Sequence, residues 1–258
     1  MYRLKNPHTV LATIQKRPTA VKSIEIRGGR AGTCWEEVVD LAADCGIAVT
    51  SQRTGHTQRR RGQQTERAGG NSALIEPPSP VPLSKLLTRH VGTTGLWMAL
   101  DQVQDPQNLG ALFRLAGFFG ICGIVITRDR SASVTETVCD VSAGGVEHVP
   151  FSCVSNLAQA IKTIHEEGIW VLGTCERSTS SIWEVPRDRH WMLVVGNEAA
   201  GLRRLTREKC DQVCALRAGG PVSSLNVATA AAACLTVLSN PARTSLVEAS
   251  NPRSERRP

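Results

Sequence analysis

A βαβ pattern runs through LWMALDQVQDPQNLGALFRLAGFFGICGIVIT, the stretch Leu96–Thr127. An apolar run gives way to a polar loop, a helical pattern and a β-branched run. Asp105 before Pro106 is a favourable N-cap with proline in the first turn, and Gly120 supplies a left-handed residue to end the helix near Phe119. This unit predicts an α/β fold, with a mostly parallel sheet and helices on both faces.

One face of the predicted helix is unusual. Gly110, Arg114 and Gly117 follow one another at spacings of four and three, so an arginine stands between two positions without side chains. Each glycine costs a helix about 1 kcal/mol relative to alanine. We therefore expect this face to leave room for something that approaches the arginine.

Composition and charge limit the classes of protein to which this chain can belong. The chain has 258 residues, 41% of them hydrophobic, which is enough for a real core in one large domain or two of ordinary size. Its net charge is +7 and its pI is near 9.1. Because the excess is arginine gathered in particular places, it favours a polyanion such as RNA as partner over a small acidic substrate.

The cysteines and the hydropathy indicate a cytoplasmic protein. Nine cysteines, an odd number, are scattered without CxxC spacing, which favours reduced thiols and argues against a zinc or other metal site. No run reaches about 18 apolar residues, so we expect no membrane segment.

The sequence divides into four parts. Residues 1–52 predict a small α/β domain and 53–92 a basic, proline-rich linker, followed by a larger α/β domain over 93–240 and a disordered tail over 241–258. In the linker, Arg59, Arg60 and Arg61 are candidates for RNA contact, because arginines on a phosphate backbone release counterions. The other interpretation of this segment is a solvated tether.

Three predicted strands of the larger domain end in loops of small residues, which are Gly173–Thr174, Gly196–Gly201 and Ala218–Ser224. Ligands of parallel sheets bind at the carboxyl ends of strands, so these loops predict one pocket with close backbone approach. The sequence has no GxGxxG after the first strand and no GxxxxGK[ST]. An ordinary dinucleotide or P-loop enzyme is therefore disfavoured.

Three motifs occur in order: Asp105–Gly110 with Arg114, Val195–Gly201, and Ser224–Ala228. At these residues the chain resembles the SpoU/TrmH family of the SPOUT superfamily, S-adenosylmethionine-dependent RNA ribose 2′-O-methyltransferases. The resemblance is weaker over residues 3–50, which look like the ribosomal-protein-like substrate-binding domain of many members.

The resemblance implies a C-terminal trefoil knot that binds S-adenosylmethionine, and a homodimer with the active site near the subunit interface. The residues that match the family's donor-binding loops are Gly173, Thr174, Leu193, Gly196, Glu198, Leu216, Ser224 and Leu225. Those that match its catalytic motifs are Arg114, Asn108, Glu198, Ser224 and Asn226.

The chemistry constrains these roles. An arginine stays protonated and is a poor base, so we expect Arg114 to hold an RNA phosphate and to stabilise developing alkoxide charge, with the RNA backbone filling the room beside its glycines. Asn108 either orients Arg114 or touches the ribose, and Glu198 orients Asn226 or the arginine. The identity of the base stays open. Without the motif, we would interpret Ser224 as a helix N-cap and Asn226 as a turn-forming residue.

Two segments depart from the family. His56–Thr57–Gln58 is followed by arginines where relatives carry His–Gln–Gly, and Ala215–Ala218 replaces the commoner isoleucine-proline-methionine. The substrate predicted is ribosomal RNA, with transfer RNA as an alternative. A third interpretation is a non-catalytic RNA-binding assembly factor on the same fold. The sequence does not identify which RNA or which nucleotide is methylated.

Overall fold

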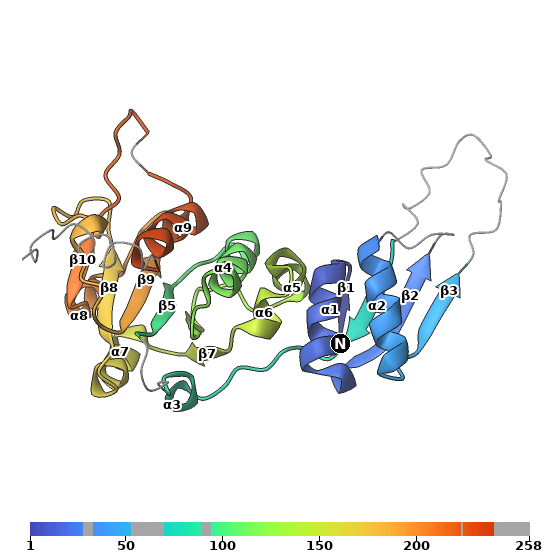
Figure 1. The fold of residues 1–258 in the computed structure, drawn as a ribbon. Coiled ribbons are helices and arrows are strands. Elements are labelled where there is room, and N and C mark those ends of the chain that lie inside the picture. The colour runs from blue at the N-terminus through green and yellow to red at the C-terminus, as the bar shows by residue number, and fades with distance from the viewer. Residues whose placement is uncertain (28–32, 53–69, 89–93, 223, 240–258) are drawn as a thin grey trace, which may run out of the picture.

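The computed structural model describes residues 1–27, 33–52, 70–88, 94–222 and 224–239. The arginines at 59–61, the motif at 56–58 and the predicted tail over 241–258 lie outside these ranges. Two sheets stand side by side, the N-terminal one in blue and the larger one running from green to orange (Figure 1). In the described part of the chain, no helix is long and apolar enough to cross a bilayer.

The larger sheet has six parallel strands in the order β10-β8-β9-β5-β6-β7. Along the chain they are β5 (Leu96–Asp101), β6 (Ile124–Thr127), β7 (Phe151–Val154), β8 (Trp170–Thr174), β9 (Trp191–Gly196) and β10 (Gln212–Cys214). The prediction of a mostly parallel α/β sheet is thus confirmed. β9 lies between β8 and β5, and every residue of β9 is buried.

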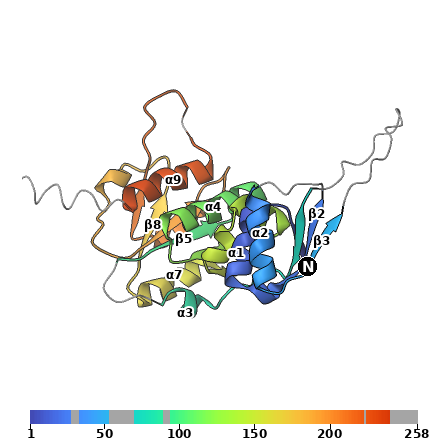
Figure 2. The same cartoon turned by 45° about the vertical axis from the view of Figure 1, so that its right-hand side comes forward.

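Helices cover both faces of this sheet. They are α3 (Leu83–Leu86), α4 (Pro106–Phe119), α5 (Glu136–Ser142), α6 (Gly145–His148), α7 (Leu157–Glu166), α8 (Arg204–Lys209) and α9 (Val227–Leu238), with the 3-10 turn η2 (Ile182–Glu184). In Figure 2, α4 and α9 lie above the strands, and α7 and α3 lie below. Alternate residues of β5 face the two sides, with Met98 and Leu100 in the core under α4, and Trp97 and Ala99 in the core over α7.

The first sheet has four strands in the order β1-β4-β2-β3. They are β1 (Tyr2–Leu4), β2 (Val21–Arg27), β3 (Val49–Gln52) and β4 (Ser72–Ile75), and the helices beside them are α1 (Pro7–Lys16), η1 (Pro18–Ala20) and α2 (Thr33–Asp44). The predicted linker over 53–92 therefore contains a central strand, since β4 pairs antiparallel with both β1 and β2. β4 has only four residues and lies between a glycine-rich segment and prolines, so its sequence is too short to show the alternating pattern of a strand.

The stretch that predicted the fold forms β5, α4 and β6 as expected. Asp105 caps α4, its side chain accepting a hydrogen bond from the Gln107 N–H at 2.9 Å, and Gly120 ends the helix with φ 65°. The helix bounds Pro106–Phe119 match the predicted ones. Local capping chemistry thus set both ends of this helix.

Gly110 of α4 has a different purpose from the one we expected. A Cβ on Gly110 would lie 2.6 Å from Cβ of Val141, because α5 packs there, and one on Gly117 would lie 3.5 Å from Cα of Gly145 in α6. The expectation that RNA fills the room is therefore wrong at Gly110. The sequence did not predict α5 and α6, since Ser133–Pro150 has no long apolar period.

Candidate active site

A cavity of about 480 Å³ opens at the carboxyl ends of β8, β9 and β10. The predicted donor-binding residues that line it are Thr174, Gly196, Glu198, Leu216, Ser224 and Leu225. Its size suits a cofactor-sized ligand. The three small-residue loops thus converge on one cavity, as the positions of the strand ends implied.

Two predicted donor-binding residues lie behind the cavity wall. Leu193 is fully buried in the core under α4 and α9. Gly173 is also buried, and a Cβ there would lie 2.9 Å from both Sγ of Cys210 and Cδ1 of Leu202. These residues match the motif in sequence, but in the structure they pack the strands that support the wall.

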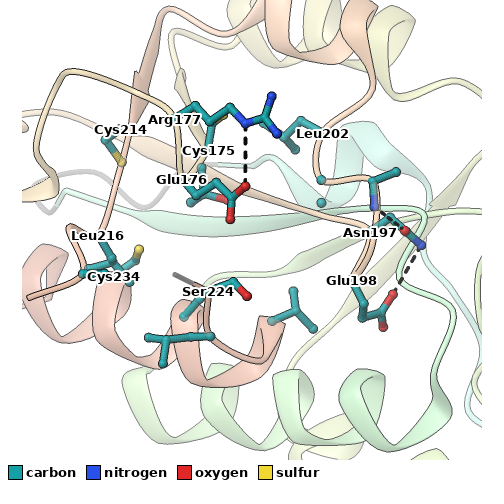
Figure 3. Close-up of a pocket in the computed structure, with 18 of the residues that line it drawn as sticks. Cys175, Glu176, Arg177, Asn197, Glu198, Leu202, Cys214, Leu216, Ser224 and Cys234 are labelled. Carbon is teal, nitrogen blue, oxygen red and sulfur yellow. Dashed lines mark hydrogen bonds and ion pairs between the residues drawn. The ribbon is translucent and has the colours of Figure 1, made fainter. Parts of the chain in front are cut away.

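The cavity has two chemically different ends (Figure 3). Cys214, Leu216 and Cys234 gather at one end, while Asn197 and Glu198 stand at the other. Burial raises the pKa of the Cys214 thiol to about 12 and that of Cys234 to about 11, so both are neutral and act as small apolar groups. One end therefore suits a flat apolar ring and the other suits polar groups.

The loop after β9 is a tight, self-bonded turn. The backbones of Asn197 and Gly201 exchange hydrogen bonds of 3.0 and 2.9 Å, and the Asn197 side chain accepts from the N–H groups of Ala199 and Ala200 at 3.0 Å. A Cβ on Gly196 would lie 2.3 Å from the carbonyl carbon of Gly201. Only glycine fits at position 196, because the returning loop lies directly against it.

An ion pair between a buried aspartate and a partly exposed arginine anchors this loop and was not predicted from the sequence. Asp101, fully buried at the end of β5, accepts from the Arg203 backbone N–H at 3.0 Å and from its Nε at 2.7 Å, and Arg203 Nη2 lies 2.6 Å from the same carboxylate. The Arg203 backbone N–H holds Oδ2 and its guanidinium lies against Oδ1, so both carboxylate oxygens are engaged. The residues are about a hundred positions apart, so no local pattern connects them.

A polar chain links all three motifs. Asn108 donates from Nδ2 to Glu198 Oε1 at 2.9 Å and accepts at Oδ1 from Asn226 Nδ2 at 2.8 Å. Asn226 in turn caps α9, accepting from the Ala228 N–H at 2.9 Å. Of the two roles we expected for Glu198, this chain favours the orientation of Asn226, which it achieves through Asn108.

Hydrogen bonds control the charge of Glu198. Partial burial raises its pKa, but hydrogen bonds from Asn108 and from the N–H groups of Gln104 and Asp105 outweigh burial and hold the pKa below the usual 4.5. Glu198 is therefore ionised at neutral pH. As a carboxylate it accepts these bonds and fixes the polar chain.

We expect Glu198→Gln to lower stability at pH 7, because the amide loses the charge-assisted bonds. Since folding depresses the pKa of Glu198, its stabilising effect is present above pH 4.5 and is lost as pH falls through the lowered pKa. Denaturant unfolding of both proteins from pH 7 to below 4 should show the stability gap closing. Glu166→Gln, which alters an exposed carboxylate on α7, is the control. An equal gap at both ends of the range would contradict this account.

Arg114 stands apart from the polar chain. It lies six residues beyond Asn108, about 9 Å along the helix axis, and does not line the cavity. Its side chain is exposed and makes no hydrogen bond or ion pair with the residues that the structure describes. The structure thus joins Asn108, Glu198 and Asn226, with Ser224 at the cavity, and leaves Arg114 pointing outward.

Three arginines on the cavity wall were missed by the sequence reasoning. They are Arg177, Arg207 and Arg217, which come from three different loops or helices. Arg217 Nη2 donates to the Thr179 carbonyl at 2.7 Å, and Arg177 Nε lies 3.8 Å from Oε1 of Glu176. Dispersed arginines give no sequence signal, but together they make this wall suitable for an anionic ligand.

The fold and the cavity define an α/β protein that binds a ligand in glycine-containing loops at the carboxyl ends of parallel strands. The model of the SpoU rRNA Methylase family matches residues 95–236. The chain belongs to this family, and the resemblance inferred from the three motifs is confirmed.

Relatives cover nearly the whole chain. It is 35% identical to the 23S rRNA (guanosine-2′-O-)-methyltransferase RlmB of Pseudomonas aeruginosa, over 88% of this chain and 92% of the relative. The protein of the same name from Coxiella burnetii is 31% identical, over 88% and 91%. A solved structure, the SpoU methyltransferase AviRb of Streptomyces viridochromogenes with AdoMet, shares the fold with a TM-score of 0.72 and 20% identity, over 95% of this chain and 90% of that one.

Proposed function

We propose that this protein transfers the methyl group of S-adenosylmethionine to a ribose 2′-hydroxyl of ribosomal RNA, and that the target is a guanosine of 23S rRNA. Family membership supports the reaction, and the names of the relatives support the substrate. The observation that carries the proposal is the Glu198–Asn108–Asn226 chain beside the cavity, because it unites the three motifs in one site.

The cavity residues fit the methyl donor. Leu216, Cys214 and Cys234 form an apolar end for the adenine, and the loop at Gly196 brings backbone polar groups to the cavity. When bound, S-adenosylmethionine supplies an electrophilic methyl group on a sulfonium. The 2′-oxygen bonds to the methyl carbon as the carbon–sulfur bond breaks, and the hydroxyl proton leaves to a base.

The chain's own residues position this reaction. Arg114 keeps its positive charge and so stabilises negative charge developing on the 2′-oxygen or holds a neighbouring phosphate. Asn108, held on both sides of its amide, fixes the start of α4 relative to the loop after β9. Arg177, Arg207 and Arg217 provide positive charge for the RNA backbone along the cavity wall.

The test is methyl incorporation from tritiated donor into 23S rRNA and into transfer RNA, followed by mapping of ribose methylation. We expect label in 23S rRNA at a guanosine, and loss of that one methyl group in a strain without the protein. Label in transfer RNA alone would overturn the substrate. Donor binding by calorimetry with no label in any RNA would instead indicate an assembly factor and overturn the enzyme.

The domain arrangement belongs to the same proposal. Residues 1–76 would form the RNA substrate-binding unit of ribosomal-protein-like type, longer than the predicted 1–52 because β4 completes its sheet. Residues 94–239 would form the methyltransferase domain. There β9 lies inside the sheet while β10 returns to the edge and α9 packs on α4, a path that supports a trefoil knot. All nine cysteines are free thiols, which supports a cytoplasmic location.

We also propose that the protein is a homodimer whose partner covers the exposed face of α4. Arg114 and Phe118 are one turn apart on this face, and Phe118 is 81% exposed. A second protomer there would bury the phenylalanine and bring Arg114 to a site near the interface. Sedimentation should show a dimer at micromolar concentration, and Phe118→Glu should shift it to monomer. A wild-type monomer would contradict this.

A further inference from the structure

Two consecutive glycines, Gly144 and Gly145, lie outside the cavity and the polar chain. They join α5 to α6, and Gly144 has a φ of 95°. Gly145 lies against the backbone of α4, where its Cβ would be 2.4 Å from the Phe113 carbonyl oxygen and 2.9 Å from the backbone nitrogen of Arg114. The chain at Gly145 is therefore in direct contact with the helical turn that carries Arg114.

Gly144 makes the opposite contact, with the N-terminal unit. Its Cβ would lie 2.9 Å from Cβ of Ala12 and 3.3 Å from the His8 carbonyl oxygen, both in α1. Its N–H donates to Oγ1 of Thr9 at 3.1 Å, and that hydroxyl donates to the Cys139 carbonyl at 2.9 Å. The two glycines thus form a layer one residue thick between α1 and α4.

Polar contacts lock this layer from the side of α1. Arg17 donates to Glu147 through Nε at 2.8 Å and Nη2 at 2.7 Å, and the Glu147 side chain is only 3% exposed. Asp140 accepts from the N–H groups of Lys5 and Asn6 at 3.0 Å. The two-point contact between Arg17 and the buried Glu147 carboxylate fixes the relative orientation of the two side chains.

The two units also share one hydrophobic core. Leu4, Val10 and Ile14 of the N-terminal unit belong to the same buried cluster as Leu112 and Phe113 of α4. The layer and the shared core together hold the two units in a fixed relative position. A displacement of α1 would have to move α6 and, through Gly145, the backbone at Arg114.

We propose that Gly144 and Gly145, locked by Arg17 and Glu147, act as positioning residues that fix Arg114 relative to the N-terminal unit. RNA held by that unit is then presented to the arginine at a set distance, which selects one nucleotide. This inference rests on the proposed function. It adds a device for site selection built into the contact between the two units.

The first test is Gly145→Ala, assayed with 23S rRNA and S-adenosylmethionine. The added methyl group pushes on the α4 backbone, so we expect kcat to fall at least about tenfold, with unchanged donor affinity by calorimetry and unchanged RNA KM. Gly70→Ala, where a Cβ meets nothing within 4 Å, is the matched control. A folded Gly145→Ala protein with wild-type kcat would overturn the proposal.

The second test keeps the proposal falsifiable if Gly145→Ala does not fold. The double variant Arg17→Met with Glu147→Gln removes both charges together, so neither is left buried alone. We expect methylation to spread to neighbouring nucleotides and the RNA KM to rise about tenfold, with donor affinity unchanged. A folded double variant with wild-type KM and a single methylated nucleotide would overturn the inference. Failure of the proposed function would differ, because wild-type protein itself would then leave the RNA unmethylated.

Discussion

We expect Arg114→Ala to lower the rate of methyl transfer by about 10²–10³-fold, the usual cost of removing a group that stabilises charge in a transition state. The affinity for S-adenosylmethionine should not change, because Arg114 does not line the cavity. Its side chain is exposed and makes no hydrogen bond or ion pair within the described residues, so the fold should not suffer. Single-turnover assays with 23S rRNA, together with calorimetry of donor binding, measure both quantities.

Arg128→Ala is the matched control, since Arg128 is also exposed and lies outside the cavity. Arg114→Lys separates charge from shape, because lysine keeps the charge but cannot make a two-point contact with a phosphate. If donor binding and activity are lost together in Arg114→Ala, then the arginine supports the donor site and the role assigned to it is wrong.

The second large effect is expected at Gly196, where alanine should abolish measurable donor binding. A Cβ would lie 2.3 Å from the carbonyl carbon of Gly201 and 2.5 Å from the backbone nitrogen of Leu202. These are backbone atoms of the returning loop, so no side-chain rotation relieves the overlap. The loop must open, which moves Glu198 away from Asn108 and changes the shape of the cavity.

Calorimetry with S-adenosylmethionine and thermal unfolding would test this change. We expect loss of donor binding with a folded core, because residues 198–201 of the displaced loop are exposed. Gly70→Ala again controls for a glycine-to-alanine change where space is free. A Gly196→Ala protein that binds the donor with wild-type affinity would show that this turn does not shape the cavity.

The sequence predicted those parts of the fold that depend on local chemistry. Asp105, Pro106 and Gly120 fixed the ends of α4, because capping involves only neighbouring backbone groups. The long apolar strands were also clear. In contrast, β4 was assigned to the linker and α5 and α6 were not predicted, since short elements gain their stability from partners distant in sequence.

The candidate site was predictable to the extent that its motifs lie at strand ends. Glycine loops at the ends of β8 and β9 indicated one cavity, and Asn108, Glu198 and Asn226 do meet beside it. That Asn108 is hydrogen-bonded to both Glu198 and Asn226 could not be predicted, because it depends on the packing of α4 against α9. The ion pair between Asp101 and Arg203 could not be predicted from the sequence, because only the folded sheet brings these two distant residues together.

The sequence by itself determined the α/β class, the family and the residues of the three motifs, because strand ends, caps and glycine turns are set by local backbone requirements. Only the tertiary structure decided what Gly110 of α4 and the Gly144–Gly145 pair are for. Spacing shows that a side chain is missing, but not which atoms take its place. Here those atoms are Val141 beside Gly110, Ala12 beside Gly144, and the α4 backbone beside Gly145.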